Sequence, residues 1–205
     1  MINKNTMQLL IATKNKGKIA ELKNLFGDLP IQLRSLNDFP NLPDVEETGK
    51  TFAENSALKA GAYARQTDLW SLADDSGLEV AALNGAPGVF SARYAGENAS
   101  DEANIEKLLR EIGKYDQRQR DARFVCAMAI ADNAGEIKFV AEGFCSGKII
   151  SERRGTNGFG YDPIFIPDGF AETFAEISAS AKQKISHRGR AAAKIIQYLR
   201  HFIAV

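Results

Sequence analysis

Hydrophobic residues along the chain switch between the spacing of strands and the spacing of helices. Apolar residues form a short run at 9–12 and a nearly continuous run at 123–131, which is typical of buried strands. Over residues 19–26 and 186–203 they instead recur every three or four positions, as on one face of a helix. The pattern therefore predicts strands that alternate with helices.

Capping and turn residues place further elements. A second strand is expected near residues 31–34. Thr51 is followed three residues later by Glu54, which is the capping-box pattern, so a helix is expected from there to about Thr67. Another helix, capped by Ser100 or Asp101, should run through Glu111.

A third strand is expected at residues 70–74. Two aspartates, a serine and a glycine follow at 74–77, and these residue types favour turns. We therefore expect the strand to end at Asp74 and the chain to turn there.

The turn residues at 132–135 separate the run at 123–131 from alternating apolar positions at 137–141, which predicts a long antiparallel hairpin. Helices alternating with strands, together with this hairpin, predict an α/β fold with a mixed sheet. The length of 205 residues suits one domain, expected over residues 7–205. The polar segment 1–6 is expected to be a disordered extension.

Composition limits the classes of partner. Lysine plus arginine and aspartate plus glutamate number 26 each, so any phosphate site must be a local patch. The two cysteines, Cys126 and Cys145, form no CxxC motif, which argues against a disulfide framework or a cysteine zinc site. No apolar run approaches the length of a membrane span. We expect a cytoplasmic protein without a nucleic-acid or membrane partner.

Several familiar sites fail on spacing. Residues 49–51 end like a P-loop, but the first glycine of that motif would fall at Asp44, and two glutamates would lie inside the phosphate cradle. The glycines near residue 160 are followed by Pro163, where a Rossmann motif needs glycine. Only two histidines are present, too few for a histidine-rich metal site.

Polar, glycine and charged residues are dense in the segments 12–18, 46–60, 73–77, 157–165 and 180–190. The first places Thr13, Asn15 and Lys18 at a helix start, where free backbone N–H groups and the helix dipole hold anions. A phosphate chain would fit there. The alternative is an ordinary solvated helix N-terminus.

The acids Asp74 and Asp75 are adjacent and should point to opposite sides of an extended chain, so that one faces a site and the other braces it. With Glu46, the inward aspartate could hold Mg²⁺, which prefers carboxylates, phosphates and water. The alternative is a turn of acids that caps the next segment. Asn55 and Lys59, four residues apart, share a helix face. Together these segments point to a nucleoside triphosphate.

Five motifs in order resemble those of the inosine triphosphate pyrophosphatases, from residue 7 over almost the whole chain. ATKNKGKIAEL, beginning at residue 12, is similar to the T-x-N-x-x-K opening of that family, and EETGKTFAENSALKA and ADDSGLEVAALNGAPGVFSARYAG follow. NGFGYDPIF and ISHRG resemble the two C-terminal motifs. Lys14 occupies a variable place where many members carry glycine.

The resemblance implies Mg²⁺-dependent hydrolysis of dITP, ITP or XTP to a monophosphate and pyrophosphate, which would cleanse the nucleotide pool. It implies an elongated three-layer α/β fold with a mixed β-sheet, two lobes and a central active-site cleft, commonly as a homodimer. Asp75 would accept a proton from the attacking water, and Glu46 and Asp75 would bind the metal. The residues implied to hold the triphosphate are Thr13, Lys14, Asn15, Lys16, Gly17, Lys18 and Lys59. Ser76 would contact the substrate and Phe159 would stack on the base. The base and sugar pocket would be completed by Gly160, Tyr161, Asp162, Lys182, His187 and Arg188.

Two other functions stay open at this point. One is a related pyrophosphatase with another base preference, and the other is a nucleotide-binding or nucleic-acid-binding module without catalysis. Intact acids at Glu46 and Asp75 argue against the second, because carboxylates repel phosphate in the absence of a metal.

Overall fold

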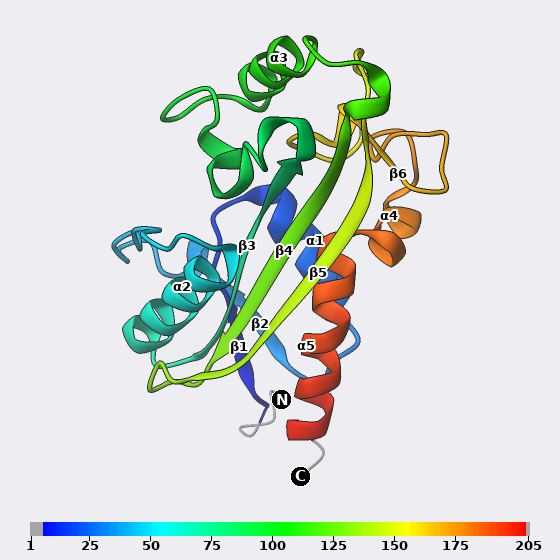
Figure 1. Ribbon diagram of the computed structural model, residues 1–205. Coiled ribbons are helices and arrows are strands. Elements are labelled where there is room, and N and C mark those ends of the chain that lie inside the picture. The colour runs from blue at the N-terminus through cyan, green and yellow to red at the C-terminus, as the bar shows by residue number, and fades with distance from the viewer. Residues whose placement is uncertain (1–5, 204–205) are drawn as a thin grey trace. The chain divides into compact units, whose positions relative to one another are not determined.

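The computed structural model describes residues 6–203 (Figure 1). The predicted extension at 1–6 lies outside these described residues except for Thr6, which belongs to no helix or strand. The helices and strands are β1 (Gln8–Ile11), α1 (Lys16–Phe26), β2 (Gln32–Ser35), α2 (Phe52–Thr67), β3 (Trp70–Val80), α3 (Asp101–Ile112), β4 (Asp121–Ala131), β5 (Ile137–Ile149), β6 (Phe165–Pro167), α4 (Ala179–Ile185) and α5 (His187–Ile203).

The strands form one mixed sheet in the order β2-β1-β3-β4-β5-β6. β1 pairs in parallel with both β2 and β3, whereas β5 pairs with β6 in antiparallel fashion. The predicted hairpin turn is confirmed, since the amide of Gly135 donates to the carbonyl of Asp132 and the amide of Asp132 donates to that of Glu136. The predicted α/β class with a mixed sheet is therefore confirmed.

By internal contacts the chain groups into two compact units. Unit 1 comprises Met1–Asp75, Ala127–Glu142 and Arg190–Val205, and unit 2 comprises Ser76–Cys126 and Gly143–Gly189. The chain passes from one unit to the other within β3, β4, β5 and α5. The prediction of one domain over residues 7–205 stays a prediction.

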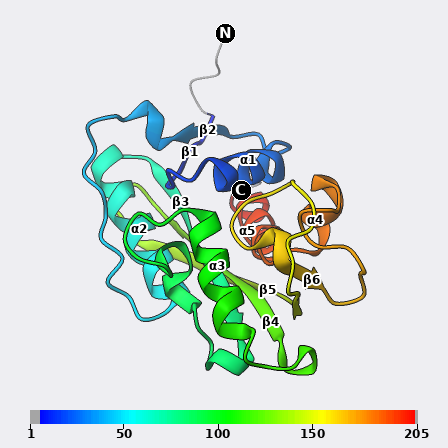
Figure 2. The ribbon, with the colours of Figure 1, turned by 90° about the horizontal axis from the view of Figure 1, so that it is seen from above.

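In unit 1, α2 covers one face of the sheet strands, while α1 and α5 cover the other (Figure 2). Side chains along β1 alternate between these faces. Leu10 packs in a buried cluster with Ala60 and Ala64 of α2, so the neighbouring Leu9 and Ile11 point to the opposite face. The small alanines of this cluster let α2 lie close to the strands.

In unit 2, α3 and the ends of β3, β4 and β5 share one hydrophobic core. Leu108 and Ile112 of α3 are fully buried there, and the rings of Phe124 and Phe165 meet edge to face with their centroids 4.8 Å apart. This core supports the loop at residues 157–165, because Tyr161 and Phe165 belong to the same cluster.

The expected end of a strand at Asp74 is wrong. β3 continues as a strand through residues 74–77 to Val80. The two aspartates stay in the strand because lysine and asparagine side chains from α1 and α2 contact their carboxylates, which the turn propensity of the local sequence cannot reveal.

Gly77 also belongs in the strand for a packing reason. A Cβ atom there would lie 2.4 Å from Oγ of Ser91 and 2.5 Å from the carbonyl oxygen of Gly88. The same Ser91 hydroxyl accepts the amide of Leu78 at 2.9 Å. Only glycine allows this close approach.

We expect the replacement Gly77→Ala to destabilise the fold by about 1–3 kcal/mol, the usual cost of overpacking. The free energy of unfolding in urea measures this loss. An unchanged unfolding midpoint would contradict the prediction, because the backbone carbonyl of Gly88 has no alternative rotamer to adopt.

The C-terminal elements differ slightly from expectation. Ser186, the expected start of the last helix, ends α4 instead, and α5 begins at His187. Neither α4 nor the three-residue β6 was predicted, because each is too short to show a hydrophobic period. Within residues 6–203, none of the helices has both the length and the apolar character needed to cross a membrane.

Candidate functional site

The loop between β1 and α1 is held by its own side chains. Asn15 is the N-cap of α1, and its Oδ1 accepts the amide of Lys18 at 3.0 Å. Thr13 in turn accepts the amide of Asn15 through Oγ1 at 3.2 Å. The amides of Lys16 and Gly17 occupy the first helical positions, which have no acceptor within a helix. They are the amides of this loop best placed for an anion.

The lysines of this loop differ in their surroundings. Lys14 and Lys16 are exposed. A hydrogen bond to Asp44 raises the pKa of Lys14, although both partners of this ion pair are open to solvent. Lys18 is mostly buried, and its Nζ lies 3.2 Å from Oδ2 of the fully buried Asp74. Of these three lysines, Lys18, in the first turn of α1, is the one held by a buried acid.

Asp74 and Asp75 point toward different helices, as their positions in a strand predict. Asp74 meets Lys18 of α1, whereas Asp75 meets Asn55 and Lys59 of α2. The two adjacent acids thus have separate partners, and Asp75 is the one beside α2.

Both carboxylate oxygens of Asp75 have a partner on α2. Nδ2 of Asn55 donates to Oδ2 at 3.1 Å, and Nζ of Lys59 lies 3.6 Å from Oδ1. The residue is only 6% exposed. Burial raises the pKa of Asp75 above its ordinary value, while the charges of Lys59 and Lys18 oppose that rise.

Lys59 joins the strand to the loop before α2. Its Nζ donates to Oε1 of Glu47 at 2.6 Å and to the carbonyl oxygen of Asp74 at 2.9 Å. Burial lowers the pKa of Lys59, but the nearby Asp75, Glu47 and Asp74 outweigh it and leave that pKa above its ordinary value. Lys59 is accordingly charged at neutral pH.

The two adjacent acids of that loop have different surroundings. Glu46 is exposed, and it is the neighbouring Glu47 that contacts Lys59. Sequence reasoning did not assign Glu47 a role, and the only signal was its place in an acidic pair. Within the described residues no three histidine, cysteine, aspartate or glutamate side chains are grouped so that they could hold a metal.

In unit 2, a turn at residues 158–162 is built around one carboxylate. Oδ2 of Asp162 accepts the amide of Phe159 at 2.9 Å and the ammonium of Lys182 at 2.6 Å. Gly158 has φ +77°, and a Cβ there would lie 2.0 Å from the same oxygen. The amide of Gly160 donates to Asp101 at 2.7 Å. The turn is therefore held both by Asp162 within it and by Asp101 of α3.

Cations surround the half-buried ring of Phe159. Nζ of Lys182 lies 5.1 Å from the ring centroid, and Cζ of Arg188 lies 5.5 Å from it. Arg188 is 1% exposed and donates to Oγ of Ser76 at 2.7 Å. Four of the predicted residues are thus brought together in unit 2.

His187 and Tyr161 are placed in the core. The imidazole of His187 stacks on Phe124 with centroids 4.6 Å apart. The hydroxyl of Tyr161 donates to the carbonyl oxygen of Ser91 at 2.9 Å, and burial raises its pKa. Neither residue is exposed, so both are packed within unit 2.

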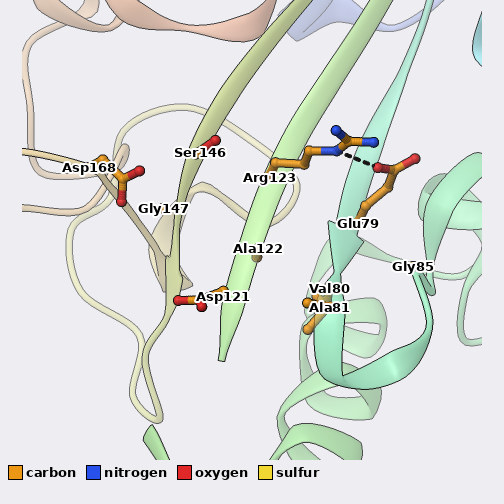
Figure 3. A pocket seen from close by; sticks show the side chains of 10 residues that line it. All are labelled: Glu79, Val80, Ala81, Gly85, Asp121, Ala122, Arg123, Ser146, Gly147 and Asp168. Atoms are coloured by element: carbon orange, nitrogen blue, oxygen red, sulfur yellow. Dashed lines mark hydrogen bonds and ion pairs between the residues drawn. The ribbon is translucent and has the colours of Figure 1, made fainter. Parts of the chain in front are cut away.

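A separate cavity of about 500 Å³ lies in unit 2 (Figure 3). Two of its lining residues are joined by an ion pair, since the side chain of Arg123 on β4 extends toward Glu79 on β3, with 2.7 Å between Nε and Oε2. Asp121, Ser146 and Asp168 also line it. It contains none of the predicted site residues.

The fold and these groups have the features of a nucleotide-binding α/β protein. A sequence model described as the Ham1 family matches residues 9–198. A dITP/XTP pyrophosphatase of Bacillus cereus (strain ZK / E33L) is 50% identical over 192 residues, covering 93% of this chain and 94% of that protein. Another, from Geobacter sulfurreducens, is 49% identical and covers 94% and 96%.

Solved structures agree. A HAM1 protein from Coxiella burnetii has a TM-score of 0.87 and 44% identity, covering 96% of this chain and 100% of that one. The Staphylococcus aureus Ham1 protein has a TM-score of 0.82 and 46% identity, with 95% and 98% covered. The chain belongs to the Ham1 family.

Proposed function

We propose that this protein hydrolyses non-standard purine nucleoside triphosphates, dITP, ITP and XTP, to the monophosphate and pyrophosphate. The names of its relatives support this proposal over nearly the full length of the chain. The observation in the structure that carries it is the buried carboxylate of Asp75, held by Asn55 and Lys59 on its two oxygens.

Asp75 would act as the proton acceptor. Water is a weak nucleophile, so a carboxylate must take its proton as it attacks phosphorus. A base whose pKa lies closer to neutral works better, and burial shifts the pKa of Asp75 in that direction. Lys18 and Lys59, together with the amides at the start of α1, would neutralise the triphosphate.

The proposal includes a hydrated Mg²⁺ ion held by acids of unit 1. Such an ion needs only one or two protein carboxylates, because substrate phosphates and water complete its shell. Asp75 and Glu46 are the proposed ligands, and Glu47 adds a further carboxylate to the same loop. When bound, the ion would supply charge neutralisation at the phosphates.

The residues of unit 2 would hold the base and sugar. Phe159 offers an aromatic face, and Ser76, Lys182 and Arg188 offer polar groups beside it. Hypoxanthine and xanthine carry an acceptor at position 6 where adenine carries a donor. Donors of the pocket would be left unmatched by ATP, at a cost of about 1–3 kcal/mol for each buried group.

A homodimer in the cytoplasm, with no nucleic-acid or membrane partner, is part of the same proposal. The family resemblance supports the homodimer, and the equal numbers of acidic and basic residues support the absence of a nucleic-acid or membrane partner. Sedimentation of the purified protein tests the dimer, and a stable species of monomer mass would contradict it.

The experiment that tests the function is pyrophosphate release from dITP, ITP, XTP, dATP, dGTP and dTTP at equal concentration, with and without Mg²⁺. We expect rapid, Mg²⁺-dependent release from the inosine and xanthine nucleotides and little from the others. Rapid pyrophosphate release from another nucleotide would support the proposed reaction but overturn the proposed preference for inosine and xanthine bases. Nucleotide binding without turnover would favour a binding module.

A further inference from the structure

Asn55 uses both ends of its amide in the core of unit 1. It is fully buried in the first turn of α2. Its Nδ2 donates to Oδ2 of Asp75 at 3.1 Å, and its Oδ1 accepts the amide of Gly49 at 2.8 Å. One side chain therefore joins the strand acid to the loop at residues 46–50.

The orientation of this amide follows from its two partners. Turned by 180°, the NH₂ group of Asn55 would face the amide of Gly49, and its oxygen would face the carboxylate of Asp75. Both contacts would then be repulsive. The donor of Asn55 is therefore committed to Asp75.

Lys59 lies one turn further along the same face of α2. Its Nζ is 3.6 Å from the other oxygen of Asp75 and 2.6 Å from Oε1 of Glu47. A carboxylate with a different partner on each oxygen cannot rotate without losing one of them. The spacing of four residues on α2 thus fixes the plane of the Asp75 carboxylate.

The loop is shaped to reach Asn55. A Cβ atom on Gly49 would lie 2.6 Å from Oδ1 of Asn55 and 2.7 Å from Cβ of Glu54. Only glycine permits this approach. The capping box of Thr51 and Glu54 fixes the chain immediately after the loop, through hydrogen bonds of 3.1 and 3.2 Å.

We propose that Asn55 is a positioning residue for the hydrolysis, which orients the carboxylate of Asp75 and ties it to the loop that carries Glu46 and Glu47. This inference rests on the role of Asp75 in the proposed function. Loss of the amide would leave Asp75 in place but remove one of the contacts that fix the plane of its carboxylate, so the chemical step would suffer more than substrate binding.

The test compares Asn55→Ala with a matched control, Asn104→Ala. Asn104 is also a buried asparagine on a helix, and its amide joins the amide of Ala95 at 2.7 Å and the carbonyl oxygen of Ala92 at 3.2 Å. Each variant loses two hydrogen bonds of a buried side chain, but only Asn55→Ala loses one to the carboxylate of Asp75, since both partners of Asn104 are backbone groups. We expect Asn55→Ala alone to lower kcat, by about 10- to 100-fold, with a smaller change in KM.

A second variant, Asn55→Asp, separates the two bonds. It keeps an acceptor for the amide of Gly49 but replaces the donor to Asp75 by an oxygen. We expect kcat to fall as in Asn55→Ala. Amide hydrogen exchange in a peptide covering residues 44–51 should be as slow in Asn55→Asp as in the wild-type protein, but faster in Asn55→Ala. Thermal unfolding of each variant confirms that the protein compared is folded.

The outcomes are distinguishable. An active wild-type protein with Asn55→Ala and Asn55→Asp no slower than Asn104→Ala overturns this inference alone. A wild-type protein that releases no pyrophosphate overturns the proposed function and this inference with it. A fall in kcat confined to the Asn55 variants supports both.

Discussion

Asp75→Asn should lose about 10²- to 10⁴-fold in the rate of pyrophosphate release, the usual contribution of a general base. The amide is nearly the same size as the carboxylate but accepts no proton at neutral pH. The measurement is the steady-state rate with dITP under saturating Mg²⁺. Asp75 is also a proposed metal ligand, so the loss should lie toward the upper end of this range.

The matched control is Asp74→Asn, at the neighbouring position on the opposite side of β3. Asp74 contacts Lys18 and has no proposed part in proton transfer. The variant should therefore lose less activity than Asp75→Asn. An active Asp75→Asn beside an inactive Asp74→Asn would exchange the two assignments and remove Asp75 as the base.

The largest loss of stability is expected for Lys182→Met. Lys182 and Asp162 form an ion pair at 2.6 Å, with side chains only 8% and 3% exposed. Removing the lysine takes this cation away from a buried carboxylate, and breaking such a pair costs about 3–5 kcal/mol. Urea unfolding followed by circular dichroism measures this change.

The double variant Lys182→Met with Asp162→Asn is the control. Its asparagine is neutral and can still accept the amide of Phe159, so stability should return toward that of the wild-type protein. If the double variant were less stable than Lys182→Met alone, the loss would come from packing rather than from the stranded charge.

The sequence predicted correctly the elements that are determined by contacts between neighbouring residues. The helix after Thr51 and the hairpin turn at 132–135 occur where capping and turn residues place them. Aspartate, serine and glycine favour turns in most surroundings, so residues 74–77 predicted an end of β3 at Asp74. Here their partners come from α1 and α2, and such long-range contacts override local preference.

The candidate site, too, was predictable in part. The family and its motif positions were recognisable in the sequence, and the comparisons confirm the family. The spacing of Asn55 and Lys59 predicted that they share a helix face. It did not predict that this face contacts Asp75, because hydrophobic periodicity carries no information on a contact between residues 20 positions apart. The individual residue roles stay predictions.

The placement of Asp75 within an eleven-residue strand, rather than in a loop, has an entropic consequence. Backbone order costs about 1–2 kcal/mol for each residue that must be fixed, and the folded sheet has already met that cost for Asp75. If Asp75 is the base, as proposed, the substrate would meet it already ordered, and any ordering that accompanies binding would fall on segments outside the sheet, such as the exposed loop that carries Glu46.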